Sequence, residues 1–127
     1  MEQHEQTPGQ LLFTVLSQWD WYYEELPTID EDRFWQAVTS ILNPKETLEL
    51  ELRLGRRLGY RLTFDAVASV LKRDRDGRIG LTGTRAQQIE YKALRKLRHP
   101  KSRALWIEAA SADTREKLQR EDKHERW

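Results

Sequence analysis

The stretch from residue 83 to residue 100, GTRAQQIEYKALRKLRHP, constrains the fold more than any other part of the sequence. Apolar side chains recur there at the spacing of an α-helix, and amides and basic groups fill the opposite side. Thr82 or Thr84 is the predicted N-cap, and Pro100 ends the helix or follows its last residue. A helix with one apolar face must bury that face, so other helices have to supply a core. The side chains predicted to face inward are Ala86, Ile89, Ala93, Leu94 and Leu97.

Capping residues and apolar spacing predict further helices before this stretch. Residues 10–26 fit a helix that Pro27 ends, and Asp30 can cap a second helix. Residues 63–72 fit a short helix with Thr63 as its cap. The sequence therefore predicts an all-α fold, a small helical bundle.

The segment LNPKETLELELRLG carries a full set of helix-boundary signals. Asn43 is a good N-cap, Pro44 suits the first helical position, and Glu46 completes a capping box. Gly55 is expected to end the helix. Its centre alternates apolar and charged residues as a strand would, but Leu, Glu and Arg favour helix and β-branched residues are absent there. We predict a helix over 44–54.

The front of the chain is rich in aromatic residues. The main interpretation is that these rings fill the core of extra helices packed on the domain. The alternative is an exposed interface for another protein, for which Trp21 and Trp35 are the best candidates. The aromatic residues within this 23-residue stretch are Phe13, Trp19, Trp21, Tyr22, Tyr23, Phe34 and Trp35.

The net charge of +1 hides a strong asymmetry along the chain. Residues 1–50 carry ten acidic and two basic side chains, whereas residues 51–103 carry five acidic and fifteen basic ones. A basic middle predicts an acidic partner, and nucleic acid is the commonest such partner. A charge-rich solvated surface is the alternative interpretation.

Several classes of site are absent from the sequence. There are no cysteines, and His4, His99 and His124 lie far apart without ligand spacing, so we predict no metal and no cofactor. No nucleophile–base set, phosphate-binding glycine loop or carboxylate pair can be assembled, so we do not expect an enzyme. Apolar runs are too short to span a membrane and no signal-peptide pattern is present, so we expect a soluble, cytoplasmic protein that engages no membrane.

The helices over 63–72 and 84–98 form a helix-turn-helix candidate with an extended turn. Its second helix offers amides that match the edge of adenine, Gln87 and Gln88, and basic groups that can neutralise phosphates. The full set of predicted DNA-facing residues is Thr63, Thr84, Arg85, Gln87, Gln88, Lys92, Arg95, Lys96 and Arg98.

The runs LNPKETLELELRLG, TFDAVASVL and GTRAQQIEYKALRKLRHP together resemble region 4 of the sigma-70 family, the promoter-recognition subunits of bacterial RNA polymerase. The run QQIEYKALRKLRHP is similar to the end of the recognition helix in primary-type sigma factors. The resemblance covers about residues 31–105. It gives the organisation that we expect, in which residues 1–9 are disordered, 10–42 form aromatic helices packed on the domain, 43–105 form the helix-turn-helix domain, and 106–127 form a charged helix or tail.

The resemblance implies a domain that recognises the −35 promoter element in the major groove and docks on the flap of the polymerase β subunit. Carried over to this chain, Gln88 matches the family's base-contacting glutamine, and Lys92, Arg95, Lys96 and Arg98 match its basic end. The leucines on the helix that matches the flap-docking part are Leu50, Leu52 and Leu54.

The chain departs from the family pattern at the start of the recognition helix, where Gly83, Thr84 and Gln87 replace an Arg, a Glu and an Arg. An arginine bidentate to guanine supplies about 1–3 kcal/mol of discrimination, which a glutamine cannot replace. The preferred sequence therefore differs from the usual −35 element, or sequence recognition is weaker. An insertion of about eight residues, KRDRDGRI, also lengthens the turn, and it can either contact phosphates or stay in solvent.

Nothing in residues 1–40 resembles the second sigma domain, which melts the −10 region. Our main hypothesis is a transcription factor that joins RNA polymerase on promoter DNA. In one version of this hypothesis, the chain is the half of a split sigma factor that recognises the −35 element, and a separate protein recognises the −10 region. The alternative hypothesis is a protein-binding adaptor or decoy. It would keep the sigma fold on polymerase or on another DNA-associated complex, with little sequence recognition.

Overall fold

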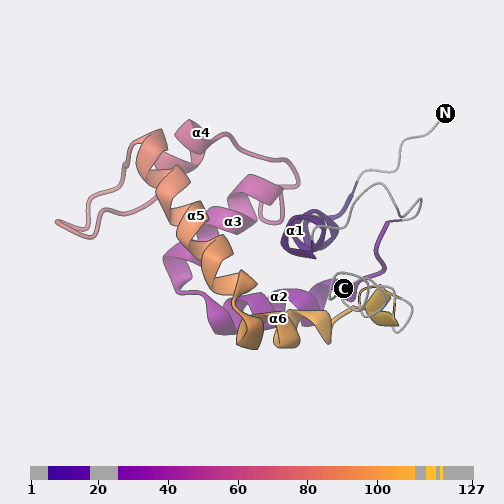
Figure 1. Cartoon of the computed structure of the whole chain (residues 1–127). Helices are drawn as coiled ribbons and strands as arrows, with labels where there is room; N and C mark the ends of the chain where they lie inside the picture. Colours follow the sequence, from indigo (N-terminus) through magenta and orange to yellow (C-terminus); the bar gives the residue numbers. More distant parts are fainter. Residues whose placement is uncertain (1–5, 18–25, 111–113, 117, 119–127) are drawn as a thin grey trace. The chain divides into compact units, whose positions relative to one another are not determined.

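The protein is all-α, as the sequence predicts, in a computed structural model that describes residues 6–17, 26–110, 114–116 and 118 (Figure 1). Within those residues, extended pairing is limited to two isolated bridges, Ile29 with Ala110 and Lys72 with Ile79. None of the described helices is long and apolar enough to cross a membrane. The helices are α1 (Pro8–Ser17), α2 (Glu31–Ile41), α3 (Pro44–Leu54), α4 (Phe64–Ala68), α5 (Gly83–Arg98) and α6 (Pro100–Ile107).

The chain divides into two compact units. One comprises Met1–Val38 with Arg98–Trp127, and the other comprises Thr39–Leu97. From the sequence we expected the helix-turn-helix domain to run from residue 43 to residue 105. The segment predicted to form the helix-turn-helix belongs to the second unit, which holds α3, α4 and almost all of α5.

The first unit is built around an aromatic cluster. The Phe13 ring meets Trp106 edge-on at 5.3 Å between centroids and lies 6.1 Å from Phe34. Trp35 meets Phe34 edge-on at 5.9 Å. These rings are buried, so the core interpretation holds for Phe13, Phe34 and Trp35. Trp19, Trp21, Tyr22 and Tyr23 lie outside the described residues.

The start of α1 differs from the sequence prediction. Residues 8 and 9 are helical rather than disordered, because the Glu31 carboxylate accepts a hydrogen bond from the Gly9 amide at 3.0 Å. A Cβ at Gly9 would lie 1.7 Å from Glu31 Oε2, so the glycine permits this close approach. Val15, which fits the apolar spacing, is exposed.

The boundary signals of α3 are all confirmed. Asn43 Oδ1 accepts from the Glu46 amide at 2.8 Å, and Glu46 Oε1 accepts from the Asn43 amide at 3.0 Å. Pro44 occupies the first turn. Gly55 ends the helix in the left-handed conformation at φ +85°, which glycine adopts without the steric cost of a Cβ. Purely local chemistry therefore sets both ends of this helix.

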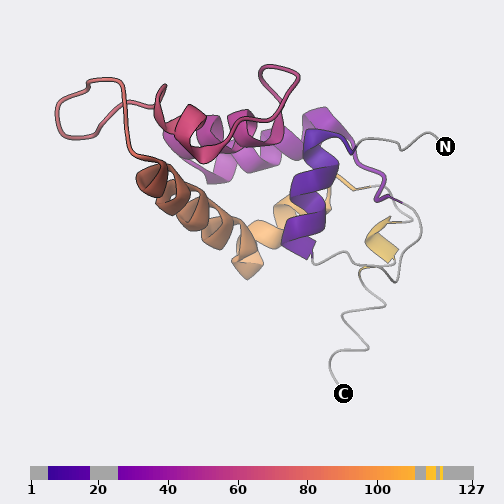
Figure 2. The ribbon, with the colours of Figure 1, turned by 90° about the horizontal axis from the view of Figure 1, so that it is seen from above.

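The helix α4 is shorter than predicted but has the predicted cap. Thr63 Oγ1 accepts from the Ala66 amide at 3.2 Å, and the helix ends at Ala68 rather than continuing to residue 72. The chain turns there, and the carbonyls of Ala68 and Leu71 accept from the amides of Leu81 and Gly80. The turn lets Leu71 join the core of this unit, whose buried members include Leu52, Val67, Ala68, Leu71, Ala86 and Ile89. Figure 2 shows α3, α4 and the loop before α5 from above.

Candidate nucleic-acid interface

The helix α5 has one buried side and one exposed side. Thr82 is its cap, since Thr82 Oγ1 accepts from the Arg85 amide at 3.1 Å. Leu94 is only partly buried, but the other predicted inward residues are buried: Ala86, Ile89, Ala93 and Leu97. The polar side of α5 is therefore available to a partner.

Most of the predicted DNA-facing residues lie on this exposed side. Thr63 is exposed as well, but its hydroxyl is used as the cap of α4. The exposed predicted residues of α5 are Thr84, Arg85, Gln87, Gln88, Lys92, Arg95 and Arg98.

Lys96 has a structural partner. Its Nζ lies 2.7 Å from Oε1 of Glu46, whose side chain is 4% exposed. Glu46 is also the third residue of α3 and completes its capping box. Lys96 thus links α5 to the start of α3, a contact that the sequence prediction did not include.

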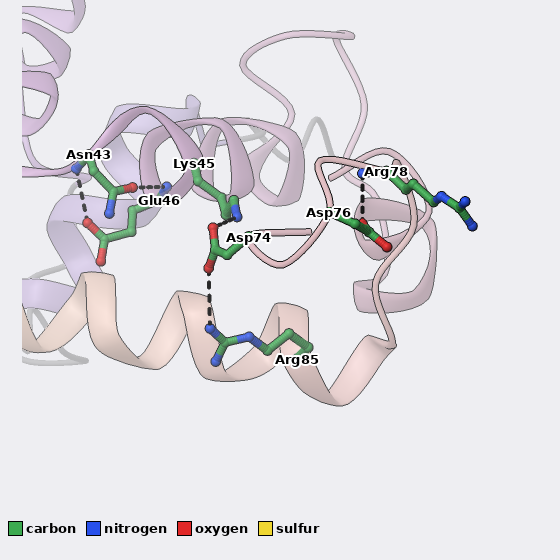
Figure 3. Close-up of polar contacts among 7 residues, drawn as sticks. All are labelled: Asn43, Lys45, Glu46, Asp74, Asp76, Arg78 and Arg85. Atoms are coloured by element: carbon green, nitrogen blue, oxygen red, sulfur yellow. Dashed lines mark hydrogen bonds and ion pairs between the residues drawn. The ribbon is translucent and has the colours of Figure 1, made fainter. Parts of the chain in front are cut away.

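The insertion between α4 and α5 is an ordered loop. Over residues 72–79 (the inserted loop), Lys72 and Ile79 form a bridge, and the Arg73 amide donates to the Arg78 carbonyl at 2.8 Å. Gly77 makes the turn at φ +70°. The Asp76 carboxylate accepts from the Arg78 amide at 2.9 Å (Figure 3). These contacts fix the direction in which the loop presents Asp74.

Asp74 connects the inserted loop to both long helices of the unit (Figure 3). Lys45, at the start of α3, donates a hydrogen bond to Asp74 Oδ1. Arg85 Nη2 of α5 lies 3.9 Å from Asp74 Oδ2. The neighbouring Lys45 and, more weakly, Arg85 and Lys92 hold the pKa of Asp74 below its usual value, so the group is ionised at neutral pH.

The same network reaches the predicted base-contacting residue. Arg85 Nη1 donates to Gln88 Oε1 at 3.2 Å. The chain of contacts therefore runs from Lys45 through Asp74 and Arg85 to Gln88. These four side chains, together with Lys92, line a pocket of about 390 Å³ between the start of α3 and the middle of α5.

Gly83, a departure from the sigma pattern, has a local structural reason. A Cβ at this residue would lie 2.1 Å from Oδ1 of Asp65. The Asp65 carboxylate of α4 thus occupies the space beside the first turn of α5, which has no acidic residue of its own. A carboxylate is favourable at the positive end of a helix. An arginine at residue 83 could not fit without moving Asp65.

The same unit contains a buried carboxyl group on α3. Glu49 of α3 is fully buried, and burial together with the nearby Glu90 carboxylate raises its pKa to about 9. Arg53 counters this rise in part. Arg53 Nε pairs with Glu90 at 3.1 Å, Nη1 donates to the Leu62 carbonyl at 3.2 Å, and the guanidinium lies 3.8 Å from the centroid of the Phe64 ring. These contacts join α3 to α5 and to the start of α4.

The residues proposed for a polymerase or protein interface need correction. Leu50 and Leu52 are both buried because α3 is covered on each of the two sides on which they lie, and Leu54 is only partly exposed. Trp35 is buried against Phe34, so it is not spare for a partner. Trp21 lies outside the described residues. The large apolar side chains that are exposed just after α3 are Leu58 and Tyr60.

Sequence reasoning missed Lys45 and Asp74, which complete the polar network. The only signal in the sequence was an acidic residue in a basic insertion, which does not identify its partner. Among the described residues, no group of three or more histidine, cysteine or carboxylate side chains could hold a metal ion.

Comparisons of the chain with models of known protein families, with curated proteins and with solved structures gave no match. Any functional assignment therefore rests on the residues described above.

Proposed function

We propose that this chain is a sigma region 4-like transcription factor that binds a −35-type site in promoter DNA together with RNA polymerase. The observation that carries the proposal is the exposed face of α5, on which amides and basic groups are gathered while the opposite face is buried. In a helix-turn-helix protein such a face enters the major groove. The proposed location is the cytoplasm, where promoter DNA is found in bacteria.

The chemistry of that face suits separate roles in base and phosphate recognition. The amide of Gln88 can donate and accept at once, as the edge of adenine requires. Lys92 and Arg95 lie further along the exposed side and carry the positive charge that neutralises phosphates. Gln88 is therefore proposed to set sequence preference, and Lys92 to contribute affinity for any sequence.

The test compares two single variants on two kinds of DNA. Duplexes are first selected from a random library by the chain in complex with core RNA polymerase, and binding to selected and random duplexes is then titrated. Gln88→Ala should lose about 1–3 kcal/mol on the selected DNA and little on random DNA. Lys92→Ala should weaken binding to both DNAs equally. It should also lower the magnitude of the slope of log affinity against log salt concentration by about one, since one phosphate contact is lost. Equal losses on both DNAs for Gln88→Ala would remove its assigned role.

Docking on polymerase is the second part of the proposal. Since Leu50 and Leu52 are buried, the apolar surface next to α3 is formed by Leu58 and Tyr60. Size-exclusion co-elution of the chain with core RNA polymerase at moderate salt tests this part. Leu58→Ser with Tyr60→Ser should abolish co-elution, whereas replacement of the exposed Val70 by Ser should leave it intact.

The adaptor hypothesis is supported by one specific observation. Arg85 and Gln88 are already engaged with each other, and Arg85 is paired with Asp74. An adaptor could keep this network closed and bind polymerase without recognising bases. Co-elution with polymerase, combined with a selection that yields no preferred DNA sequence, would favour the adaptor over the promoter-binding factor.

A further inference from the structure

The carboxylate of Asp74 lies among three cationic side chains from two helices. Lys45 of α3 bonds one carboxylate oxygen, and Arg85 of α5 faces the other at 3.9 Å. Lys92, about two turns further along α5, lines the same pocket and acts on Asp74 through its charge. Three positive charges thus surround one negative charge, so the cluster attracts a further anion.

The pocket holds one other acidic side chain, Glu46, but that carboxylate is engaged elsewhere. Glu46 Oε1 accepts from Lys96 Nζ and from the Asn43 amide. Its charge is therefore matched within the fold. The cationic group formed by Lys45, Arg85 and Lys92 (the cation cluster) has Asp74 as its acidic partner.

A carboxylate held between a lysine and an arginine is chemically close to a phosphodiester. Both groups carry one negative charge and present two oxygens that accept hydrogen bonds from ammonium and guanidinium groups. The duplex DNA that α5 is proposed to bind carries such a group at every nucleotide.

Asp74 is held in a way that allows its displacement. Its side chain is 77% exposed and that of Arg85 is 51% exposed, so the contact resembles a surface ion pair that contributes little to stability. The hairpin contacts of the inserted loop, from the Lys72–Ile79 bridge to the Gly77 turn, do not involve the Asp74 carboxylate. The loop can therefore release the carboxylate without losing its own fold.

We infer that Lys45, Arg85 and Lys92 form a binding site for a backbone phosphate of duplex DNA, and that Asp74 fills this site when DNA is absent. The inference rests on the proposed function, since it names the ligand of the same face of α5. When a phosphate replaces Asp74, Arg85 turns toward the phosphate and leaves the Gln88 amide open to a base. Phosphate binding and base recognition are thereby coupled through one arginine.

The test compares two charge-removing variants in the inserted loop. Asp74→Asn removes the internal carboxylate, and Asp76→Asn removes the same charge two residues away, where the side chain contacts only Arg73 and the Arg78 amide among the described residues. Binding of the full chain to random duplex DNA is titrated by fluorescence anisotropy over a salt series. Asp74→Asn should tighten binding about tenfold at low salt and steepen the salt dependence. Asp76→Asn should change affinity by less than about twofold. Equal effects of the two variants would overturn the inference.

A double variant assigns the gain to the cation cluster. The gain in DNA affinity from Asp74→Asn should disappear when Lys45→Gln is added. The phosphate then lacks the lysine that pairs with Asp74 in the free protein. A gain that persists in the double variant would contradict the assignment of Lys45.

Failure of the proposed function has a different signature. If no form of the chain binds duplex DNA, the proposed function is wrong, and the site is tested by NMR with inorganic phosphate as the probe. Shifts of Arg85 and Lys92 signals in Asp74→Asn, absent in Asp76→Asn, would support an anion site that Asp74 fills. Their absence in both variants would overturn it.

Discussion

Lys96 on α5 lies 2.7 Å from Oε1 of Glu46, the glutamate that completes the capping box of α3. A residue that the sequence assigned to DNA therefore also stabilises the contact between α3 and α5. Its removal would leave Glu46, which is almost fully buried, without its charged partner.

Lys96→Met should lower the free energy of unfolding by about 1–3 kcal/mol, since a buried carboxylate would lose a charged hydrogen bond. Lys92→Met, on the exposed side of the same helix, should change it by less than about 0.5 kcal/mol. Urea denaturation of both variants checks the difference. Equal stability of the two variants would show that the pair with Glu46 contributes nothing.

The buried Glu49 predicts a pH dependence of stability. Its pKa is raised from 4.5 to about 9 in the folded state, so the folded chain binds a proton that the unfolded chain releases above about pH 4.5. The contribution of Glu49 to the free energy of unfolding is fully present below pH 4.5, and it is lost as the pH rises through the pKa of the folded state. The slope from this one group is at most about 1.4 kcal/mol per pH unit.

Glu49→Gln should therefore make stability less dependent on pH between about pH 5 and pH 9. The control is Glu108→Gln, a glutamate whose side chain is 66% exposed. Denaturant midpoints measured across this range compare the two variants with the wild type. An unchanged slope in Glu49→Gln would mean that Glu49 is ionised in the folded protein at neutral pH.

Gly83 and Asp65 should be energetically coupled. In an Asp65→Ala background, Gly83→Ala should stabilise the chain by about 0.5–1 kcal/mol, because alanine is the better helix former. In the wild type, Gly83→Ala should raise the free energy of unfolding by less, since the new Cβ displaces the Asp65 carboxylate from the start of α5. A double-mutant cycle measures the coupling, and an equal effect of Gly83→Ala in both backgrounds would contradict it.

Arg53→Lys should cost about 1–2 kcal/mol of stability, because a lysine cannot contact Glu90, the Leu62 carbonyl and the Phe64 ring together. Arg56→Lys is the matched change three residues further along the chain, at an arginine whose Nε lies 3.2 Å from Oε2 of Glu51. It should be nearly neutral in thermal unfolding. Similar losses for both would show that the geometry of Arg53 is unimportant.

Local signals in the sequence predicted the helix boundaries well, because caps act over three or four residues. The box formed by Asn43 and Glu46, the Gly55 stop and the Thr63 cap all appear where they were expected. The length of α4 could not be predicted in this way. It is set by hydrogen bonds from Gly80 and Leu81, which lie beyond the inserted loop.

The candidate site was predicted only in part. Periodicity identified the exposed side of α5, but the alternating sequence of α3 did not show that Leu50 and Leu52 are both buried. The pairing of Asp74 with Lys45 joins residues 29 positions apart. No local rule predicts such a contact, because it depends on how the helices pack.

The most direct test of DNA binding by α5 is an NMR titration of the full chain with duplex DNA at low salt. If α5 binds DNA, the largest shifts occur at the exposed residues of α5, with Arg85, Gln88 and Lys92 prominent, and at Asp74 in the inserted loop. Shifts absent from α5, or confined to the unit formed by Met1–Val38 and Arg98–Trp127, would contradict it.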